Sequence, residues 1–516
     1  MNLKCPGTIA ALAIALLLAV TGAGCMEASD DQTQITPAPA SAADDLCSQA
    51  EAAMADGNYR MASSLYEEAY EIYTDSDDAA NALLARNGLF RATRAVAEFP
   101  YNRTAAVAVM RENIPTLSED GIDAWLDKHA QTITSEGESL YFWDVAQNYL
   151  YANGDQIRPM SDKRFDDFRY ITRYADPTDV TPAGDCGTLP YVNPIRYTGM
   201  ERLALPADIL PETGTIAIWY PLPLETASQR DVVITNLSHE EYIIAGPVTE
   251  GEIAYVCYEV PADEIEGDLV ITADIAFTSY EQRFTVDPAT VGEYNTMDPE
   301  YILYTSSTRN IAVTGDVRDL ALTIVGTETN PYLQAQALYW FIIDTYPYSH
   351  VPHLSLDTVV PKVSESSHMF ATGHGDCGTQ SMFFAALCRS LGIPARATGG
   401  YQMLISETPG AHFWAEYYIE GYGWIPCDTT VAEIADRVDI AEKEREKFRA
   451  YYANNLDPTR LFIQKDVDVP MNPSLPADAV VFRLVRQVPA VLCDEGEMDL
   501  DLLAGEYFTI HVKGKE

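Results

Sequence analysis

Residues 375–396, GDCGTQSMFFAALCRSLGIPAR, decide the fold of this chain. Asp376 is a favourable N-cap residue, and apolar side chains recur after it at helical spacing. Gly392 stands where helices commonly end in a left-handed residue, and the proline two positions later prevents the helix from continuing. The stretch therefore predicts a helix over residues 377–391.

Cys377 lies in the first turn of this expected helix. The unpaired backbone N–H groups and the helix dipole favour an anion there, so we expect the pKa of the thiol to be lowered. The same N–H groups could form part of an oxyanion hole. The alternative is a buried structural cysteine, of which Cys388 on the same helix is an example. The position at a helix start makes Cys377 a candidate nucleophile.

Two expected strands further along can supply a base and a residue that orients it. Residues 411–419, AHFWAEYYI, are aromatic and β-branched, and residues 423–430, GWIPCDTT, return as a second strand after a turn with glycines. His412 and Asp428 share a face of this hairpin if the loop holds an odd number of residues, or if a bulge intervenes. The aspartate would then fix the imidazole tautomer and stabilise the imidazolium.

Together, the blocks quoted above resemble the transglutaminase-like superfamily in their order and spacing. The similarity covers roughly residues 300–440, and the β-rich segment before it is similar more weakly. The resemblance implies a papain-like α+β core of a helix and an antiparallel sheet, with a catalytic triad of Cys377, His412 and Asp428. It also implies a thioester acyl-enzyme. Papain itself has the order Cys, His, Asn with a far longer Cys–His separation, so it fits less well.

The domain organisation follows from length and from changes in periodicity. The chain has 516 residues, too many for one core, so we expect about three folded units in an α+β multidomain protein. The expected order is a signal peptide at 1–25, a flexible tether at 26–43, a helical tetratricopeptide-like region at 44–180, a β-sandwich-like domain at 187–297, a transglutaminase-like core at 300–450 and a strand-rich C-terminal extension at 451–516.

The helical and β-rich regions differ in the period of their apolar residues. Residues 54–69 resemble a tetratricopeptide helix pair, in which the small Ala62 and Ala69 would let two helices pack closely. No clear second copy follows at the expected spacing, so a helical cap or spacer is favoured over a peptide-binding groove. The β-sandwich is indicated by short β-branched runs at even intervals, punctuated by Pro, Gly and Asn.

The first 25 residues have the pattern of an export signal. Lys4 precedes an apolar run at 9–20, and small residues lead up to Cys25. This pattern resembles a lipoprotein box, except that Gly22 stands where the box usually has leucine. Lipidation of Cys25 would anchor the exported chain at the outer face of the cytoplasmic membrane. Ordinary cleavage, with Cys25 incidental, is the alternative.

Charge and cysteine spacing restrict the partners. Lys and Arg number 33 against 77 Asp and Glu, a formal net charge of −44, so nucleic acids and anionic membrane surfaces would be repelled. We therefore expect a protein or peptide substrate, including cell-wall peptide, and contact with the membrane only through the N-terminal lipid. No CxxC pair occurs, so a zinc knuckle or a thioredoxin-type site is unsupported. We expect no metal site and no cofactor.

Two further patterns indicate less chemistry. Residues 184–188, GDCGT, repeat the pentapeptide around Cys377, but Leu-Pro follows and no apolar-striped helix continues, so Cys186 is interpreted as a linker residue. His350 and His353 have no carboxylate or cysteine cluster at metal-ligand spacing, and we expect a loop there.

An amphipathic helix is expected over residues 333–345, and a loop is expected from there to about residue 375. Tyr346 and Tyr348 end this expected helix. Either hydroxyl could donate to an oxyanion, although aromatic residues at such places are as often packing residues.

These features predict cysteine-dependent acyl transfer on an amide bond. If water resolves the thioester, the protein is a cysteine protease or amidase; if an amine does, it is a cross-linking transglutaminase. The triad alone does not choose, since both outcomes share the first half of the reaction. Prokaryotic members of the superfamily are often hydrolytic, which favours hydrolysis of a peptide or isopeptide bond at the cell surface. The alternative to an enzyme is a surface binding or scaffold protein with a vestigial core. The presence of all three triad residues counts against this alternative.

Overall fold

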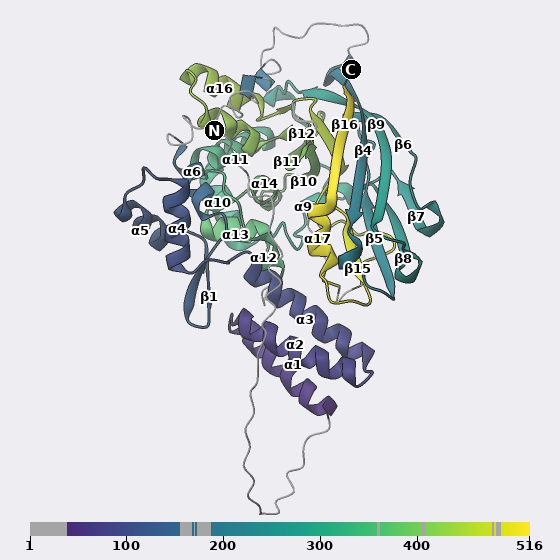
Figure 1. Ribbon diagram of the computed structural model, residues 1–516. Helices are drawn as coiled ribbons and strands as arrows, with labels where there is room; N and C mark the ends of the chain where they lie inside the picture. Colours follow the sequence, from purple (N-terminus) through teal and green to yellow (C-terminus); the bar gives the residue numbers. More distant parts are fainter. Residues whose placement is uncertain are drawn as a thin grey trace, which may run out of the picture.

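The computed structural model describes residues 39–154, 168–169, 171–172, 187–358, 362–403, 408–476, 479–480 and 487–515. The predicted signal peptide with Cys25, and also Cys186, lie outside the described residues. The described chain mixes N-terminal helices with several antiparallel sheets (Figure 1), so the α+β multidomain expectation is confirmed. Among the described residues no helix combines the length and the apolar character that crossing a bilayer requires.

The N-terminal helices form a bundle that projects from the rest of the molecule (Figure 1). Its members are α1 (Pro39–Ala55), α2 (Tyr59–Asp75) and α3 (Ala79–Ala97). Ala62 and Ala69 are fully buried between these helices, which is the close packing that their small size permits. The further likeness to tetratricopeptide repeats stays a prediction.

The rest of this helical region contains a hairpin that helical periodicity did not predict. Its elements are α4 (Arg103–Asn113), α5 (Glu119–Lys128), β1 (Thr132–Ser135), β2 (Glu138–Tyr141) and α6 (Val145–Ala152). Glu136 and Gly137 both have positive φ angles, of 54° and 79°, and they form the two-residue loop between β1 and β2. Turns of this kind match the twist of paired strands. The expectation of an all-helical segment is therefore wrong at these residues.

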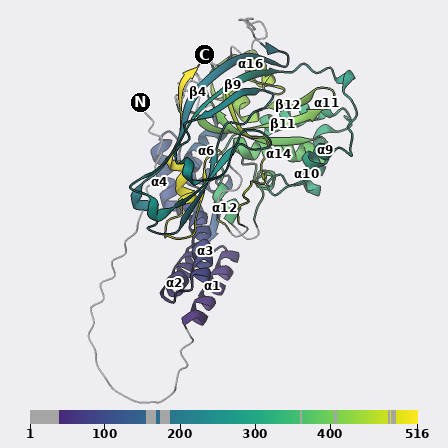
Figure 2. The same ribbon diagram turned by 90° about the vertical axis from the view of Figure 1, so that its right-hand side faces the viewer.

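Two antiparallel sheets follow and share one core. Figure 2 shows the long paired strands β4 (Tyr191–Leu205) and β9 (Leu269–Arg283) of the first sheet running side by side. The first contains β3 (Gly187–Thr188), β4 (Tyr191–Leu205), β6 (Gln229–Thr235), β9 (Leu269–Arg283), β13 (Asn455–Leu456) and β16 (Phe508–Lys515). The second contains β5 (Thr215–Pro221), β7 (Ile243–Val248), β8 (Tyr255–Pro261) and β15 (Ala490–Cys493). Alternate residues of the long strands are buried, as the period of two predicts.

The third large sheet and its helices carry the candidate site. The sheet has the order β12 (Gly423–Cys427), β11 (Gly410–Ile419), β10 (Ala395–Gln402), β14 (Arg460–Gln464). The helices are α9 (Pro299–Thr305), α10 (Gly315–Val325), α11 (Pro331–Thr345), α12 (His353–Thr358), α13 (Glu365–Thr372), α14 (Cys377–Ser390), α15 (Thr429–Ala432) and α16 (Glu442–Tyr451). The last helix, α17 (Leu500–Tyr507), packs instead against β15 and β4 of the first two sheets. Short 3-10 turns are η2 (Ala207–Ile209), η3 (Glu240–Tyr242), η4 (Ala262–Glu264), η5 (Pro288–Thr290) and η6 (Glu433–Arg437).

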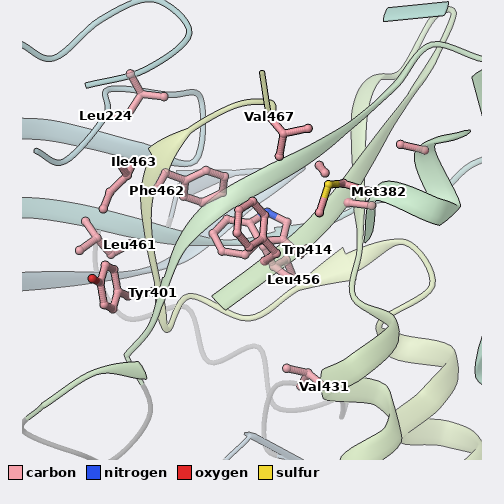
Figure 3. Packing of buried hydrophobic residues seen from close by; sticks show 14 of the residues in the cluster. Leu224, Met382, Tyr401, Trp414, Val431, Leu456, Leu461, Phe462, Ile463 and Val467 are labelled. Carbon is pink, nitrogen blue, oxygen red and sulfur yellow. The ribbon is translucent and has the colours of Figure 1, made fainter. Parts of the chain in front are cut away.

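Helix α14 is the centre of this third region. Every residue of α14 after Cys377 is buried, mainly against β10, β11 and α13. Figure 3 shows the packing around Trp414 of β11, whose ring meets Phe462 of β14 edge-on with centroids 4.6 Å apart. A helix buried on all sides cannot turn or slide without opening cavities, so the packing fixes where Cys377 stands.

Candidate active site

Helix α14 has the boundaries that its sequence predicts, to within one residue. Asp376 is its N-cap, and the Oδ1 atom of Asp376 accepts a hydrogen bond of 3.0 Å from the backbone N–H of Thr379. At the other end Gly392 has a φ angle of 79°, and its N–H bonds to the carbonyl of Arg389. Cys377 is thus the first residue of the helix, as expected.

The hairpin has the odd loop that the triad requires. Strands β11 and β12 pair Ile419 with Gly423, which leaves residues 420–422 as the loop. This register puts His412 and Asp428 on one face of the sheet. Their side chains meet there, with 2.8 Å between Nε2 of the imidazole and Oδ2 of the carboxylate.

The thiol of Cys377 lies against the strand that carries His412. Cys377 is half-buried, and its thiol lies close to the backbone N–H groups of Phe413 and Gly378, whose polarity favours the thiolate. Phe413 directly follows His412 on β11, and its ring is 3.4 Å from the position that a Cβ on Gly378 would take. The structure therefore brings the start of α14 and the histidine strand into contact.

One expectation about Cys377 is wrong. Burial, followed by the charge of the Asp376 carboxylate, raises the pKa of the Cys377 thiol above its ordinary value. The helix terminus favours an anion, but its N-cap residue places a negative charge beside the sulfur. The resting thiol is therefore neutral, and a base must remove its proton when it reacts.

Asp428 is held by four donors. Its Oδ1 accepts from the N–H of Val431 at 2.9 Å and from the hydroxyl of Thr430 at 3.3 Å, while Oδ2 accepts from His412 and, at 2.7 Å, from Arg460. Burial alone would raise the pKa of Asp428, but the charges of His412 and Arg460 outweigh it and hold that pKa well below its usual range. A fully bonded carboxylate fixes the orientation of the imidazole.

Arg460 is a site residue that the sequence interpretation missed. It is fully buried in β14, where its guanidinium bridges Asp428 and Asp457 and lies 5.3 Å from the centroid of the Trp414 ring. The available signal is a lone arginine at the start of the apolar run LFI at residues 461–463, because a buried cation needs anionic partners.

The prediction of a loop at His350 and His353 is wrong in part. His353 begins α12, and its Nε2 atom is 2.6 Å from Oδ2 of Asp376, the N-cap residue of α14. The loop expected up to residue 375 also contains a second helix, α13. Ser364 caps the start of α13, and the helix ends before Gly373, which has a φ angle of 73°. Both are ordinary helix-end signals.

The two tyrosines considered as oxyanion donors have different surroundings. Tyr346 packs against Phe341 and Phe383, with the second ring centroid 5.9 Å away, which is a packing role. Burial and then the proximity of Cys377 raise the pKa of Tyr348 well above its ordinary value. Tyr348 is therefore the tyrosine near the thiol. Within the described residues no group of three or more His, Cys, Asp or Glu side chains could hold a metal ion.

Comparison with known proteins agrees with this geometry. Residues 318–429 match the family described as the transglutaminase-like superfamily, and this range contains all three predicted catalytic residues. The chain therefore contains a transglutaminase-like core.

Two individual proteins show lower similarity to this chain. An uncharacterized protein of Haemophilus influenzae is 26% identical over 181 residues, and the match covers 30% of this chain and 47% of that protein, so it spans about half of the relative's length. A solved structure titled "The Crystal Structure of a Putative Cysteine Protease from Cytophaga hutchinsonii" is 14% identical with a TM-score of 0.37, covering 63% of this chain and 99% of that one. That likeness is too distant to argue function from.

Proposed function

We propose that this protein is a cysteine-dependent enzyme that hydrolyses a peptide or isopeptide bond through a thioester. The observation that carries the proposal is the arrangement around the thiol. Cys377 begins α14 against the strand of His412, and His412 is bonded to Asp428 at 2.8 Å. Nucleophile, base and orienting carboxylate are the three parts that acyl transfer needs.

In the first half of the proposed reaction, the sulfur of Cys377 attacks the amide carbonyl carbon while His412 takes the thiol proton. The N–H groups at the start of α14 donate to the oxygen on which negative charge develops. The C–N bond then breaks, the imidazolium of His412 gives its proton to the leaving amine, and an acyl thioester remains on Cys377. The neutral resting thiol makes the base essential at this step.

In the second half, His412 takes a proton from water and the resulting hydroxide attacks the thioester. The C–S bond breaks, the sulfur recovers the proton, and a carboxylic acid leaves. An amine in place of water would give a new amide and a cross-linked product. Asp428 stays ionised in both halves and stabilises the imidazolium each time it forms.

The proposed setting is the cell surface. The N-terminal 25 residues support export, and Cys25 supports a lipid anchor at the outer face of the cytoplasmic membrane. The substrate would be a protein or peptide there, including cell-wall peptide. The net charge of −44 supports neither nucleic acid nor direct binding to anionic lipid.

The test is to incubate the purified protein with glutaminyl and isopeptide libraries and a labelled primary amine. We expect cleaved products and released ammonia without uptake of the label, and no turnover by the Cys377→Ala variant. Predominant uptake of the label would make the protein a cross-linker. Absence of all turnover, with alkylation of Cys377 as slow as that of the buried Cys388, would make it a binding protein.

A further inference from the structure

His353 is held between two carboxylates. Its Nδ1 atom is 2.8 Å from Oε1 of Glu365, and its Nε2 atom is 2.6 Å from Oδ2 of Asp376. A carboxylate can only accept, so both ring nitrogens carry protons and the ring is an imidazolium. Burial opposes this charge, but Asp376 and Glu365 outweigh it and raise the pKa of His353 well above its ordinary value.

The two oxygens of Asp376 have separate partners. Oδ1 caps α14 through the N–H of Thr379, and Oδ2 accepts from His353. The hydroxyl of Thr379 in turn donates to Oε2 of Glu365 at 2.8 Å. These bonds close a ring from Asp376 through His353, Glu365 and Thr379 back to Asp376. The ring fixes the side chain that starts the nucleophile helix.

The same ring sets the charge next to the nucleophile. Asp376 directly precedes Cys377, and its carboxylate is the largest charge that disfavours the thiolate. The imidazolium of His353 is bonded to that carboxylate and offsets it. The other ionisable groups around His353 are Glu365 of α13, His368 of α13 and Glu98 at the end of α3.

The helical region holds His353 in place. Glu98, which follows α3, accepts hydrogen bonds from the N–H groups of Leu354 at 3.1 Å and Ser355 at 2.7 Å. The hydroxyl of Ser355 donates to the carbonyl of Ala95 in α3 at 3.2 Å. The start of α12, and therefore His353, is attached to the N-terminal helices rather than to the catalytic sheet.

We propose that His353 is a positioning residue of the active site: it holds Asp376 at the start of α14 and offsets the carboxylate charge beside Cys377. The proposal rests on the proposed function of Cys377 as nucleophile. It gives the N-terminal helices a part in catalysis beyond that of a spacer, because their contacts with α12 fix the position of His353.

The test compares His353→Gln, Asp376→Asn and the double variant in the full chain. Iodoacetamide alkylation of Cys377 is followed from pH 5 to 10 by mass spectrometry of the cysteine peptides. We expect His353→Gln to move the midpoint of the Cys377 profile up by about one pH unit, because Asp376 then lacks its opposite charge. Asp376→Asn, which keeps a capping side chain, lowers the midpoint. In the double variant the loss of His353 has no further effect.

Cys388 serves as the internal control, since it is fully buried on the same helix and reacts only if the helix opens. An unchanged Cys377 profile in His353→Gln overturns the proposal. So does a shift that is equally large whether residue 376 is Asp or Asn. If His353→Gln makes Cys388 reactive, the helix has opened and Asp376→Asn becomes the deciding variant: an unmoved midpoint there means that the Asp376 charge does not affect Cys377, and the proposal is overturned. Equal reactivity of Cys377 and Cys388 in the unchanged protein would instead overturn the proposed function.

Discussion

Two histidines meet the two N-cap aspartates of this site, and they are held differently. Asp376 caps α14 and Asp428 caps α15, and in both the Oδ1 atom serves the helix while Oδ2 accepts from the Nε2 atom of a histidine. The Nδ1 atom of His353 is bonded to a second carboxylate, that of Glu365. Among the described residues, the Nδ1 atom of His412 has no such hydrogen bond.

This difference separates a base from a fixed cation. A ring bonded to carboxylates through both nitrogens keeps both protons and cannot accept another. A ring bonded through one nitrogen is oriented but still able to take a proton from the thiol. The charge of Asp428 is offset by Arg460 as well as by His412, so His412 can change its protonation without leaving Asp428 unpaired. His353 is the cation that is hydrogen-bonded to Asp376, and His350 contributes more weakly from a greater distance.

The largest expected effect is on turnover. We expect His412→Gln to lower kcat/KM by about 10³-fold, because general-base catalysis is lost. The matched change His353→Gln should lower it only about tenfold, through the higher pKa of the Cys377 thiol. Both are measured with a peptide substrate from the library. Equal losses in the two variants would mean that the two histidines do not have the separate roles inferred here.

The second effect is on stability at the Asp428 side. Arg460→Met leaves Asp428 and Asp457 buried without their shared cation, so we expect the free energy of unfolding in urea to fall by about 3–5 kcal/mol. Arg111→Met is the control, because Arg111 pairs with Glu119 in full exposure and its loss should leave the urea midpoint in place. An unchanged urea midpoint in Arg460→Met would show that the remaining partners, His412 for Asp428 and Tyr452 and Thr459 for Asp457, are enough to stabilise both carboxylates.

The third effect separates the two sides by pH. The pKa of His353 is raised in the folded protein, so its contribution to stability is fully present below the unfolded value, about 6.5, and is lost as pH rises through the folded value. His353→Gln should cost about 2 kcal/mol near pH 6, the order expected for lost hydrogen bonds between charged groups, and the cost should fall progressively in alkaline solution. The pKa of Asp428 is lowered, so the unchanged protein should lose stability as the pH falls through the folded pKa of this carboxyl. Asp428→Asn should not show this loss of stability in acid. Urea unfolding at intervals from pH 3 to 10 measures both.

The parts of the site that the sequence predicts are those set by neighbours along the chain. The start of α14 at Asp376, its end at Gly392 and the odd loop between β11 and β12 follow from caps, turns and parity. The wrong sign for the Cys377 pKa has a local cause too, because the cap residue that predicts the helix also brings the opposing charge.

The parts that could not be predicted depend on contacts distant in sequence. His353 meets Asp376 across 23 residues, and Arg460 meets Asp428 across 32. Glu98 meets Ser355 across 257 residues, so no local pattern could attach the helical region to the site. A lone histidine or arginine has no periodicity, and its role is known only when the fold brings it to a carboxylate.

The smallest effect compares two threonine hydroxyls, one on each side. The Thr379 hydroxyl donates to Glu365 at 2.8 Å, whereas the Thr430 hydroxyl donates to Asp428 at a longer 3.3 Å. Thr379→Val should cost about 1.5 kcal/mol of unfolding free energy, because it opens the ring around His353 and leaves a buried carboxylate oxygen without that donor. Thr430→Val should cost less, because the same oxygen of Asp428 still accepts from Val431 at 2.9 Å. The urea midpoints of the two variants measure these costs. A larger loss of stability in Thr430→Val would mean that Asp428 depends more on its threonine donor than Glu365 does.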